Sequence, residues 1–302
     1  MIDRDVLSCL PTFIAVAETA SFTAAAARLG MSASATSQSI RQLEQRLGHP
    51  LFRRTTRSVS LTEQGEDLLR RASPALRELG LALEIAASAS RKPSGLLRLN
   101  VPRIAMPLVL EPVLPVMRER YPDLAIEIFV DDSAVDIVEQ GFDAGIRVGS
   151  MTSPDMIAVD VTAPLTAILV AAPSYLARCG APKSLADLQS HECIGFRLGR
   201  SGRLYDWELM DGKKEIQLAV PRTVIVNDTI FTLKLALSGF GIAYMFDALA
   251  RPYLDDGTIV QVLPKASLSE PPLSLYFPRY ANEQPKLRAF IDTAKAVLRK
   301  RR

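Results

Sequence analysis

Hydrophobic positions near the start of the chain recur at spacings of three and four, the pattern of helices with one buried face. The stripe over residues 6–17 predicts a first helix. A second is expected over residues 21–29, with Ser21 as its N-cap and Gly30 ending it, since glycine adopts the left-handed conformation at little cost. A third is expected over residues 32–47. The pattern therefore predicts a small helical core whose last two helices flank a tight turn.

The third predicted helix has two unlike faces between its cap, Ser32, and Gly48, which ends it. The apolar face consists of Ile40, Leu43 and Leu47. The opposite face is short, polar and basic, and consists of Ser34, Thr36, Ser37, Gln38, Arg41 and Gln42. Small side chains let a helix approach the DNA major groove, while amide and guanidinium groups reach base edges and phosphates. The alternative is a solvated face of an ordinary helical domain.

A hairpin, or wing, is predicted directly after this helix, and it carries Arg53, Arg54 and Arg57. Residues 28–57 hold six arginines and one acid, Glu44, whereas residues 93–302 hold 24 basic and 24 acidic side chains. The net charge of +3 hides this local excess. Because phosphate contacts supply most sequence-independent affinity for DNA, the cluster predicts double-stranded DNA as a partner.

A long helix is predicted over residues 62–90, with Thr62 as its cap. Its apolar positions step by three and four for about three heptads and are Leu69, Ala72, Leu76, Leu79, Leu83 and Ala86. Such a seam favours pairing with a second copy; the alternative is one amphipathic helix packed on its own domain. Pro74 removes one backbone hydrogen bond and is expected to kink the helix. Residues 91–95 are rich in helix-breaking types and predict a hinge.

Beyond the hinge the pattern changes to alternating strands and helices, which is typical of an open α/β layer. Strands are expected at residues 96–101, 124–130, 143–148, 166–171, 223–226, 241–245 and 273–277. Helices are expected at residues 104–120, 133–140, 229–237 and 284–299. In such sheets, ligands lie at the carboxyl ends of strands, where the strand order switches.

Four motifs in the first part of the chain belong to one family pattern. They are Phe13–Glu18 (FIAVAE), Ser21–Ala26 (SFTAAA), Leu43–Gly48 (LEQRLG) and Leu51–Arg57 (LFRRTTR). Together they closely resemble the LysR-type transcriptional regulators, and the resemblance covers the whole chain at the right length. It implies a multidomain α+β and α/β protein with a winged helix-turn-helix, a dimerising helix and an effector-binding domain shaped like a periplasmic binding protein.

The resemblance also implies domain bounds. The DNA-binding domain is expected at 1–61, the linker helix at 62–90, the hinge at 91–95 and the effector-binding domain at 96–302. Within the last, lobe I is expected at 96–162 and 268–302, and lobe II at 163–267. Two departures concern DNA reading: Ala33 stands where many relatives carry a polar residue, and Gln38-Ser39 stands where Arg-Gln is frequent. The operator sequence therefore does not carry over.

The residues after the predicted strands are those that the resemblance places around a small-molecule inducer. They are Pro102, Arg103, Ile104, Asp131, Asp132, Ser133, Arg147, Phe196, Arg197, Asn227, Asp228, Met245 and Phe246. Ile104 departs from the Ser or Thr of many relatives, which implies a different ligand or pose.

The charges among these residues leave the ligand class open. Arg103, Arg147 and Arg197 could bind an anionic ligand, since a guanidinium matches a carboxylate bidentately; ion pairs within the protein are the alternative. Asp132 and Asp228 argue equally for a cationic or hydroxylated ligand.

No catalytic constellation stands out. His49 and His191 are not at metal-ligand spacing, although an exposed His49 could contact phosphate, and no glycine-rich phosphate loop is present. Neither a metal nor a cofactor is therefore expected. Cys9, Cys179 and Cys193 form no close pair, as in reduced cytoplasmic proteins; a peroxide-sensing pair Cys179/Cys193 is the alternative to buried structural cysteines.

The chain shows no apolar segment long enough to span a membrane and no signal-peptide pattern, so a cytoplasmic location is expected. We predict a transcription regulator that binds DNA as a dimer or tetramer and changes its operator contacts when an inducer binds between the lobes. The alternative from another class is a solute-binding or enzymatic α/β protein whose N-terminal helices mediate assembly.

Overall fold

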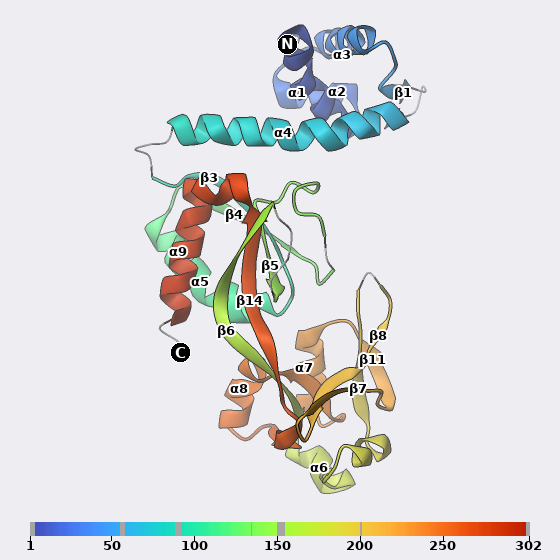
Figure 1. The fold of residues 1–302 in the computed structure, drawn as a ribbon, viewed down its shortest axis with the longest axis vertical. Helices are drawn as coiled ribbons and strands as arrows, with labels where there is room; N and C mark the ends of the chain where they lie inside the picture. The colour runs from blue at the N-terminus through green and yellow to red at the C-terminus, as the bar shows by residue number, and fades with distance from the viewer. Residues whose placement is uncertain are drawn as a thin grey trace. The chain divides into compact units, whose positions relative to one another are not determined.

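The computed structural model describes residues 4–54, 58–87, 92–133, 135–149, 155–199 and 201–299. The chain forms two compact units, Met1–Ala89 and Ser90–Arg302 (Figure 1). The predicted fold class is confirmed, because a helical unit with a short hairpin precedes a unit of mixed strands and helices. None of the helices in the described ranges combines the length and the apolar character needed to cross a membrane.

The N-terminal unit contains the predicted winged helix-turn-helix followed by one long helix. Its elements are α1 (Arg4–Thr19), α2 (Phe22–Leu29), α3 (Ala33–Leu47), β1 (Phe52–Arg54), β2 (Val59–Leu61) and α4 (Glu63–Ala87). The wing is the antiparallel pair β1–β2, in which Phe52 faces Leu61 and Arg54 faces Val59.

Helices α2 and α3 begin and end where the sequence predicts, and α4 begins where expected. The hydroxyl groups of Ser21, Ser32 and Thr62 each accept a backbone N–H of the following turn, at 3.1–3.2 Å. Gly30 and Gly48 end α2 and α3 in the left-handed region, with φ of 64° and 78°. These caps satisfy backbone groups that a helix end otherwise leaves unpaired.

The predicted heptad seam of the long helix α4 has a first part that packs inside the unit and a second part that is exposed. Leu69 packs against the core of the N-terminal unit and Ala72 is buried, so the first part of the seam is intramolecular. Leu79 and Leu83 are 53% and 64% exposed within one chain. The expectation of one continuous intermolecular seam is therefore wrong for its first half; the side chain of Ala86 lies outside the described residues. Pro74 lies within α4, which continues past it.

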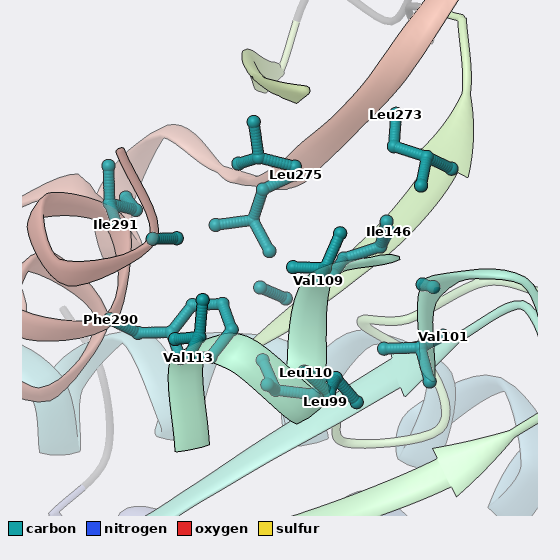
Figure 2. Close-up of a cluster of buried hydrophobic side chains, with 14 of the residues drawn as sticks. Leu99, Val101, Val109, Leu110, Val113, Ile146, Leu273, Leu275, Phe290 and Ile291 are labelled. Atoms are coloured by element: carbon teal, nitrogen blue, oxygen red, sulfur yellow. The ribbon is translucent and has the colours of Figure 1, made fainter. Parts of the chain in front are cut away.

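Lobe I of the C-terminal unit contains parallel strands and two helices that pack together. Its elements are β3 (Gly95–Val101), η1 (Met106–Leu110), α5 (Glu111–Arg120), β4 (Leu124–Val130), β5 (Ala144–Val148), η4 (Arg279–Glu283) and α9 (Pro285–Arg299). β3 pairs in parallel with both β4 and β5. Figure 2 shows apolar side chains of η1, α5 and α9, among them Val109, Val113 and Phe290, converging with Leu275 in the core of this lobe.

Lobe II contains shorter strands and a separate hairpin. Its elements are α6 (Pro173–Cys179), η2 (Ala186–Ser190), β7 (Cys193–Arg197), β8 (Leu204–Tyr205), β9 (Trp207–Asp211), β10 (Lys214–Leu218), β11 (Arg222–Val226), α7 (Thr229–Leu237), β12 (Ala243–Phe246), α8 (Asp247–Asp255), β13 (Val260–Val262) and η3 (Pro264–Ala266). β7 pairs in parallel with β11, and a single bridge from Cys193 to Ile242 connects it to the start of β12.

Two long antiparallel strands, β6 (Met156–Ala171) and β14 (Leu268–Pro278), run through both lobes side by side (Figure 1). The main sheet has the order β12-β6-β14-β5-β3-β4, and β13 also pairs with β6. The β6–β14 ladder shifts register around Pro272, which faces Pro164. Because proline has no N–H to donate, the ladder is weakest between the lobes. The exact lobe bounds given above stay a prediction.

Three local expectations are corrected. Within the helix expected at 133–140, residues 137–140 form a turn that continues to residue 141, because the Asp136 carboxylate accepts the N–H groups of Val138 and Glu139 at 2.9 and 3.0 Å. The strands expected at 166–171 and 273–277 are only parts of β6 and β14. Both strands continue past Pro164 and Pro272, because the ladder accommodates these prolines at a bulge.

We predict opposite effects of alanine at two glycines of α4. A Cβ at Gly65 would lie 2.2 Å from the carbonyl oxygen of Leu51, so Gly65→Ala should destabilise the N-terminal unit by about 1–3 kcal/mol. Gly80 has nothing within 4 Å, so Gly80→Ala should stabilise it by up to about 1 kcal/mol. Thermal unfolding of the two variants checks this. Equal shifts of the same sign would contradict the packing at Gly65.

Candidate functional site

The polar face of α3 is open to solvent except at one predicted position. Ser34, Gln38, Arg41 and Gln42 are exposed and Ser37 is partly buried. Thr36 has no exposed area, and its hydroxyl donates to the Ser32 carbonyl at 3.1 Å. The prediction that Thr36 contacts DNA is therefore wrong for this conformation. It lies four residues before the buried Ile40, on the apolar face of the helix.

The arginines of the N-terminal unit differ in what they contact. The side chains of Arg41 and Arg53 make no hydrogen bond or ion pair within the described residues. The Arg54 guanidinium lies 4.2 Å from the ring centroid of Phe22 and 3.9 Å from Glu44. Two further arginines are paired with acids on α1: Arg28 with Glu18 at 2.6 Å and Arg46 with Asp5 at 3.0 Å. Arg57 lies outside the described residues.

The single acid of this basic segment has a structural role. One carboxylate oxygen of Glu44 accepts the N–H groups of Leu51 and Phe52, at 2.8 and 3.2 Å. Glu44 thus fixes the start of β1 against α3, and it holds the wing beside the exposed polar face. Counting charges along the sequence gave no sign of this contact.

A cleft of about 380 Å³ lies between the lobes of the C-terminal unit, at the ends of their strands. Seven predicted residues line it: Pro102, Ile104, Asp132, Arg147, Phe196, Met245 and Phe246. Nine lining residues were not predicted: Val148, Ile194, Leu198, Tyr205, Trp207, Thr229, Thr232, Tyr244 and Glu270. The volume is within the usual range of roughly 300–1,000 Å³ for small-molecule sites.

Six predicted residues are not among those that line the cleft: Arg103, Asp131, Ser133, Arg197, Asn227 and Asp228. Asp131 accepts the backbone N–H of Ser133 at 2.8 Å and so shapes a turn. Asp228 caps α7 by accepting the N–H groups of Ile230 and Phe231, at 2.9 and 3.0 Å. Asn227 is exposed. These polar groups follow strands as expected, but they stabilise local backbone.

The three arginines considered for an anionic ligand are largely occupied by the protein itself. Arg147 donates from Nη2 to Asn100 Oδ1 at 2.6 Å and to the Ser133 carbonyl at 2.5 Å. Arg103 Nε lies 3.1 Å from Asp228 Oδ2, an ion pair that joins the two lobes. Arg197 is exposed and donates to the Gly202 carbonyl at 2.6 Å. Intramolecular contacts, the alternative to ligand binding, therefore account for Arg103 and for most hydrogen-bond donors of Arg147.

The unpredicted part of the cleft is an aromatic wall. Tyr205 and Trp207 come from β8 and β9, and Tyr244 comes from β12. The rings of Tyr205 and Tyr244 are 5.8 Å apart, and those of Trp207 and Tyr244 are stacked at 6.0 Å. No strand is expected from the sequence over residues 204–218, where β8, β9 and β10 lie. The alternation of polar and apolar residues over 207–218 was the available signal.

Burial and carboxylates dominate the electrostatics of this wall. Burial, followed by the charges of Glu208 and Glu215, raises the pKa of the Glu270 carboxyl above its usual value. Burial also raises the pKa of the Tyr244 hydroxyl. The Tyr205 hydroxyl donates to Glu208 at 2.6 Å. This end of the cleft is therefore acidic and partly desolvated.

The histidines and cysteines have structural surroundings. His191 Nδ1 lies 2.9 Å from the Tyr175 hydroxyl, which accepts the Glu192 N–H at 2.9 Å. Nδ1 of His49 is buried and without a hydrogen-bond partner. Cys193 is fully buried, and burial raises its pKa to about 12. Within the described ranges, no group of three or more His, Cys, Asp or Glu side chains could hold a metal ion.

Both units match families of known regulators. Residues 7–66 match "Bacterial regulatory helix-turn-helix protein, lysR family", and residues 90–299 match "LysR substrate binding domain". The chain belongs to the LysR family of transcriptional regulators. For this LysR-type regulator the family resemblance of the sequence motifs is confirmed, and a DNA-binding unit is joined to an effector-binding unit.

Known proteins match this LysR-type regulator along nearly its whole length. The uncharacterized HTH-type transcriptional regulator YcaN of Escherichia coli is 40% identical over 289 residues, 96% of this chain and 94% of that protein. PgrR of Escherichia coli is 33% identical, covering 97% and 98%. Among solved structures, CrgA from Neisseria meningitidis has a TM-score of 0.63 at 28% identity, and AphB from Vibrio cholerae has 0.64 at 26%. Each covers 96% of this chain and 98% of the solved one.

We predict that only one cysteine of this LysR-type regulator reacts with a maleimide in the native state at pH 7.5. Cys179 is exposed, whereas Cys9 and Cys193 are buried. Because the thiolate is the reactive form, the raised pKa further protects Cys193. Mass spectrometry of the labelled chain checks this, with unfolded protein as the reference for three sites. Labelling of Cys193 as fast as Cys179 would favour the thiol-sensing alternative instead.

Proposed function

We propose that this LysR-type regulator reads its operator with the open face of α3 and holds the flanking phosphates with the wing. The observation that carries the proposal is the pair of unengaged arginines, Arg41 on α3 and Arg53 on β1, beside exposed Gln38. Base contacts then come from Ser34, Ser37, Gln38 and Gln42, and phosphate contacts from Arg41, Arg53, Arg54 and Arg57. Arg54 contributes mainly by position, since Phe22 and Glu44 hold its guanidinium.

We propose that the chain works as a dimer or tetramer in the cytoplasm, without a catalytic step. Leu79 and Leu83 support pairing, because two large side chains four residues apart are exposed on one stripe of α4. Paired recognition helices about 34 Å apart would meet successive major grooves on one face of the DNA.

We propose further that an effector in the cleft changes operator contacts by a population shift between lobe arrangements. The irregular ladder at Pro164 and Pro272, and the ion pair of Arg103 with Asp228, are the contacts that differ between such arrangements. An anionic effector, one expectation from the sequence, rests on Arg147 alone, whose Nε is buried without a hydrogen-bond partner.

We predict a steep salt dependence of DNA binding. About six phosphate contacts give a slope of log K on log salt near −5. Fluorescence anisotropy with a labelled duplex, measured from 50 to 200 mM salt, checks this. A nearly flat response would favour the alternative in which the N-terminal helices only mediate assembly.

We predict that two substitutions separate phosphate binding from base reading. Arg53→Ala should weaken binding to all duplexes alike and reduce the salt slope by about one per lost contact. Gln38→Ala should change the preferred sequence with little effect on the slope, because its amide faces base edges. Selection from a random duplex pool, together with anisotropy, measures both effects.

Arg288→Ala is the matched control, since Arg288 is an exposed arginine in the other unit. If it weakened binding as much as Arg53→Ala, the proposed interface would be misplaced.

A further inference from the structure

Three aromatic rings from three strands form one side of the cleft: Trp207 is buried in the core of lobe II, and Tyr205 and Tyr244 pack against that core at the edge of the cleft. The ring centroids of Tyr205 and Tyr244 lie 5.8 Å apart, and those of Trp207 and Tyr244 lie 6.0 Å apart. All three residues line the cleft. An aromatic face carries partial negative charge and attracts a cation placed within about 6 Å of its centroid. The wall therefore offers a surface that suits an organic cation as well as an apolar group.

A carboxylate stands on the same face of the main sheet as Tyr244. Glu270 pairs with Leu165 and Tyr244 pairs with Leu169, and these two partners are four residues apart on β6. Cross-strand partners and residues spaced by an even number share one face of a sheet. Glu270 lines the cleft beside the aromatic wall, and no ion pair or hydrogen bond to its side chain occurs within the described residues.

Most hydrogen-bond donors of the cations near the cleft are already used by the protein, except the Nε atoms of Arg147 and Arg222. Arg147 donates to Asn100 and to two backbone carbonyls, and Arg103 is paired with Asp228. Arg222, which approaches the backbone of Tyr205, is paired with Asp206. Within the described residues, no lysine or arginine forms an ion pair with Glu208, Glu215 or Glu270. The aromatic end of the cleft thus has a surplus of negative charge.

The Tyr244 hydroxyl adds an unused polar group at this end. It is buried beside the Tyr205 hydroxyl, which gives its proton to Glu208 at 2.6 Å, so no donor reaches the Tyr244 oxygen with good hydrogen-bond geometry within the described residues. A ligand that donates hydrogen bonds could satisfy this oxygen and the Glu270 carboxylate together. The raised pKa of Glu270 agrees with a carboxylate that lacks a counter-ion.

We propose that the cleft binds an organic ammonium ion: an amine on an apolar or aromatic body, with its charged nitrogen between Tyr244 and Glu270. The apolar body lies against Phe196, Met245 and Phe246, Tyr205 lies beside the head group, and Trp207 stacks on Tyr244. This inference rests on the proposed function of the cleft as the effector site, and it specifies the charge of the effector.

The chain carries its own reporter for the test, because Trp207 is its only tryptophan and lines the cleft. Three probes of similar size differ in charge: 2-phenylethylamine, 2-phenylethanol and 3-phenylpropanoate. Each is titrated into the full chain at pH 7 and constant ionic strength while Trp207 fluorescence is recorded. We expect the amine to bind at least tenfold more tightly than the anion, with the alcohol between them. Stronger binding of the anion, or no response to the amine, overturns the proposal.

Substitutions then locate the charge recognition. Glu270→Gln keeps the shape of the side chain and should weaken the amine about tenfold while leaving the alcohol unchanged. Glu139→Gln is the matched control, an exposed glutamate outside the cleft lining, and should change neither. Loss of amine binding in both variants, or in neither, contradicts the role of Glu270.

The aromatic contribution is tested at Tyr244. Tyr244→Phe keeps the ring and should retain most of the amine preference, whereas Tyr244→Leu should reduce it about tenfold. Thermal unfolding of each variant confirms that it is folded before titration. A leucine variant that is folded and keeps the full preference for the amine overturns the cation–aromatic part of the proposal.

The Trp207 fluorescence titration needs no DNA, so it tests the charge of the ligand separately from effector control of DNA binding. If the amine binds as expected but leaves the DNA footprint unchanged, effector control fails and the ligand class stands. If 3-phenylpropanoate binds preferentially and alters the footprint, effector control stands and the ligand class is wrong.

Discussion

The geometry of the C-terminal unit depends on one constraint: within the described residues, the chain passes between the lobes along two strands, β6 and β14. Paired as a continuous ladder, these strands would hold the lobes as one rigid sheet. Pro164, facing Pro272, removes donors at the crossing, and the register shifts there. The two strands therefore position the lobes around the cleft. The ladder bends more easily at the prolines than on either side of them. Glu270 lies directly beside this crossing, so a cleft residue and the weak point of the ladder are neighbours in sequence.

Most charged groups in both candidate sites stabilise the protein itself, and the remaining ones define what can bind. In the N-terminal unit, Arg28, Arg46 and Arg54 are engaged with acids or a ring, which leaves Arg41 and Arg53 as unengaged cations among the described arginines from 28 to 54. In the cleft most donors of Arg147 are engaged, and the Glu270 carboxylate has no ion pair within the described residues. The sequence gives the number of charged side chains in each site. Which of them are ion-paired within the protein decides whether the remaining charge of the site is positive or negative.

Much of the fold could be predicted from the sequence because its signals are local. Caps and ending glycines depend on a few neighbouring residues, and α2 and α3 begin and end as expected. The cleft could be predicted only in part, since the rule about strand ends finds Arg147, Phe196 and Met245 but not Trp207 or Glu270. Those two come from a hairpin and from a crossing strand, and their approach is set by tertiary packing. The prediction that Thr36 contacts DNA was wrong for a related reason. Its polar side chain suggested a DNA contact, but its position along the helix places it on the buried face.

The short open face of α3 limits how much of an operator one chain can read directly. The open positions of α3 run from Ser34 to Gln42, and at 1.5 Å per residue this stretch is about 12 Å long. Base pairs in B-form DNA are spaced by about 3.4 Å, so one helix can touch the edges of only about three or four pairs. A longer target must owe the remaining selectivity of each chain to groove width and bendability, which would be read by the arginines of the wing rather than by α3.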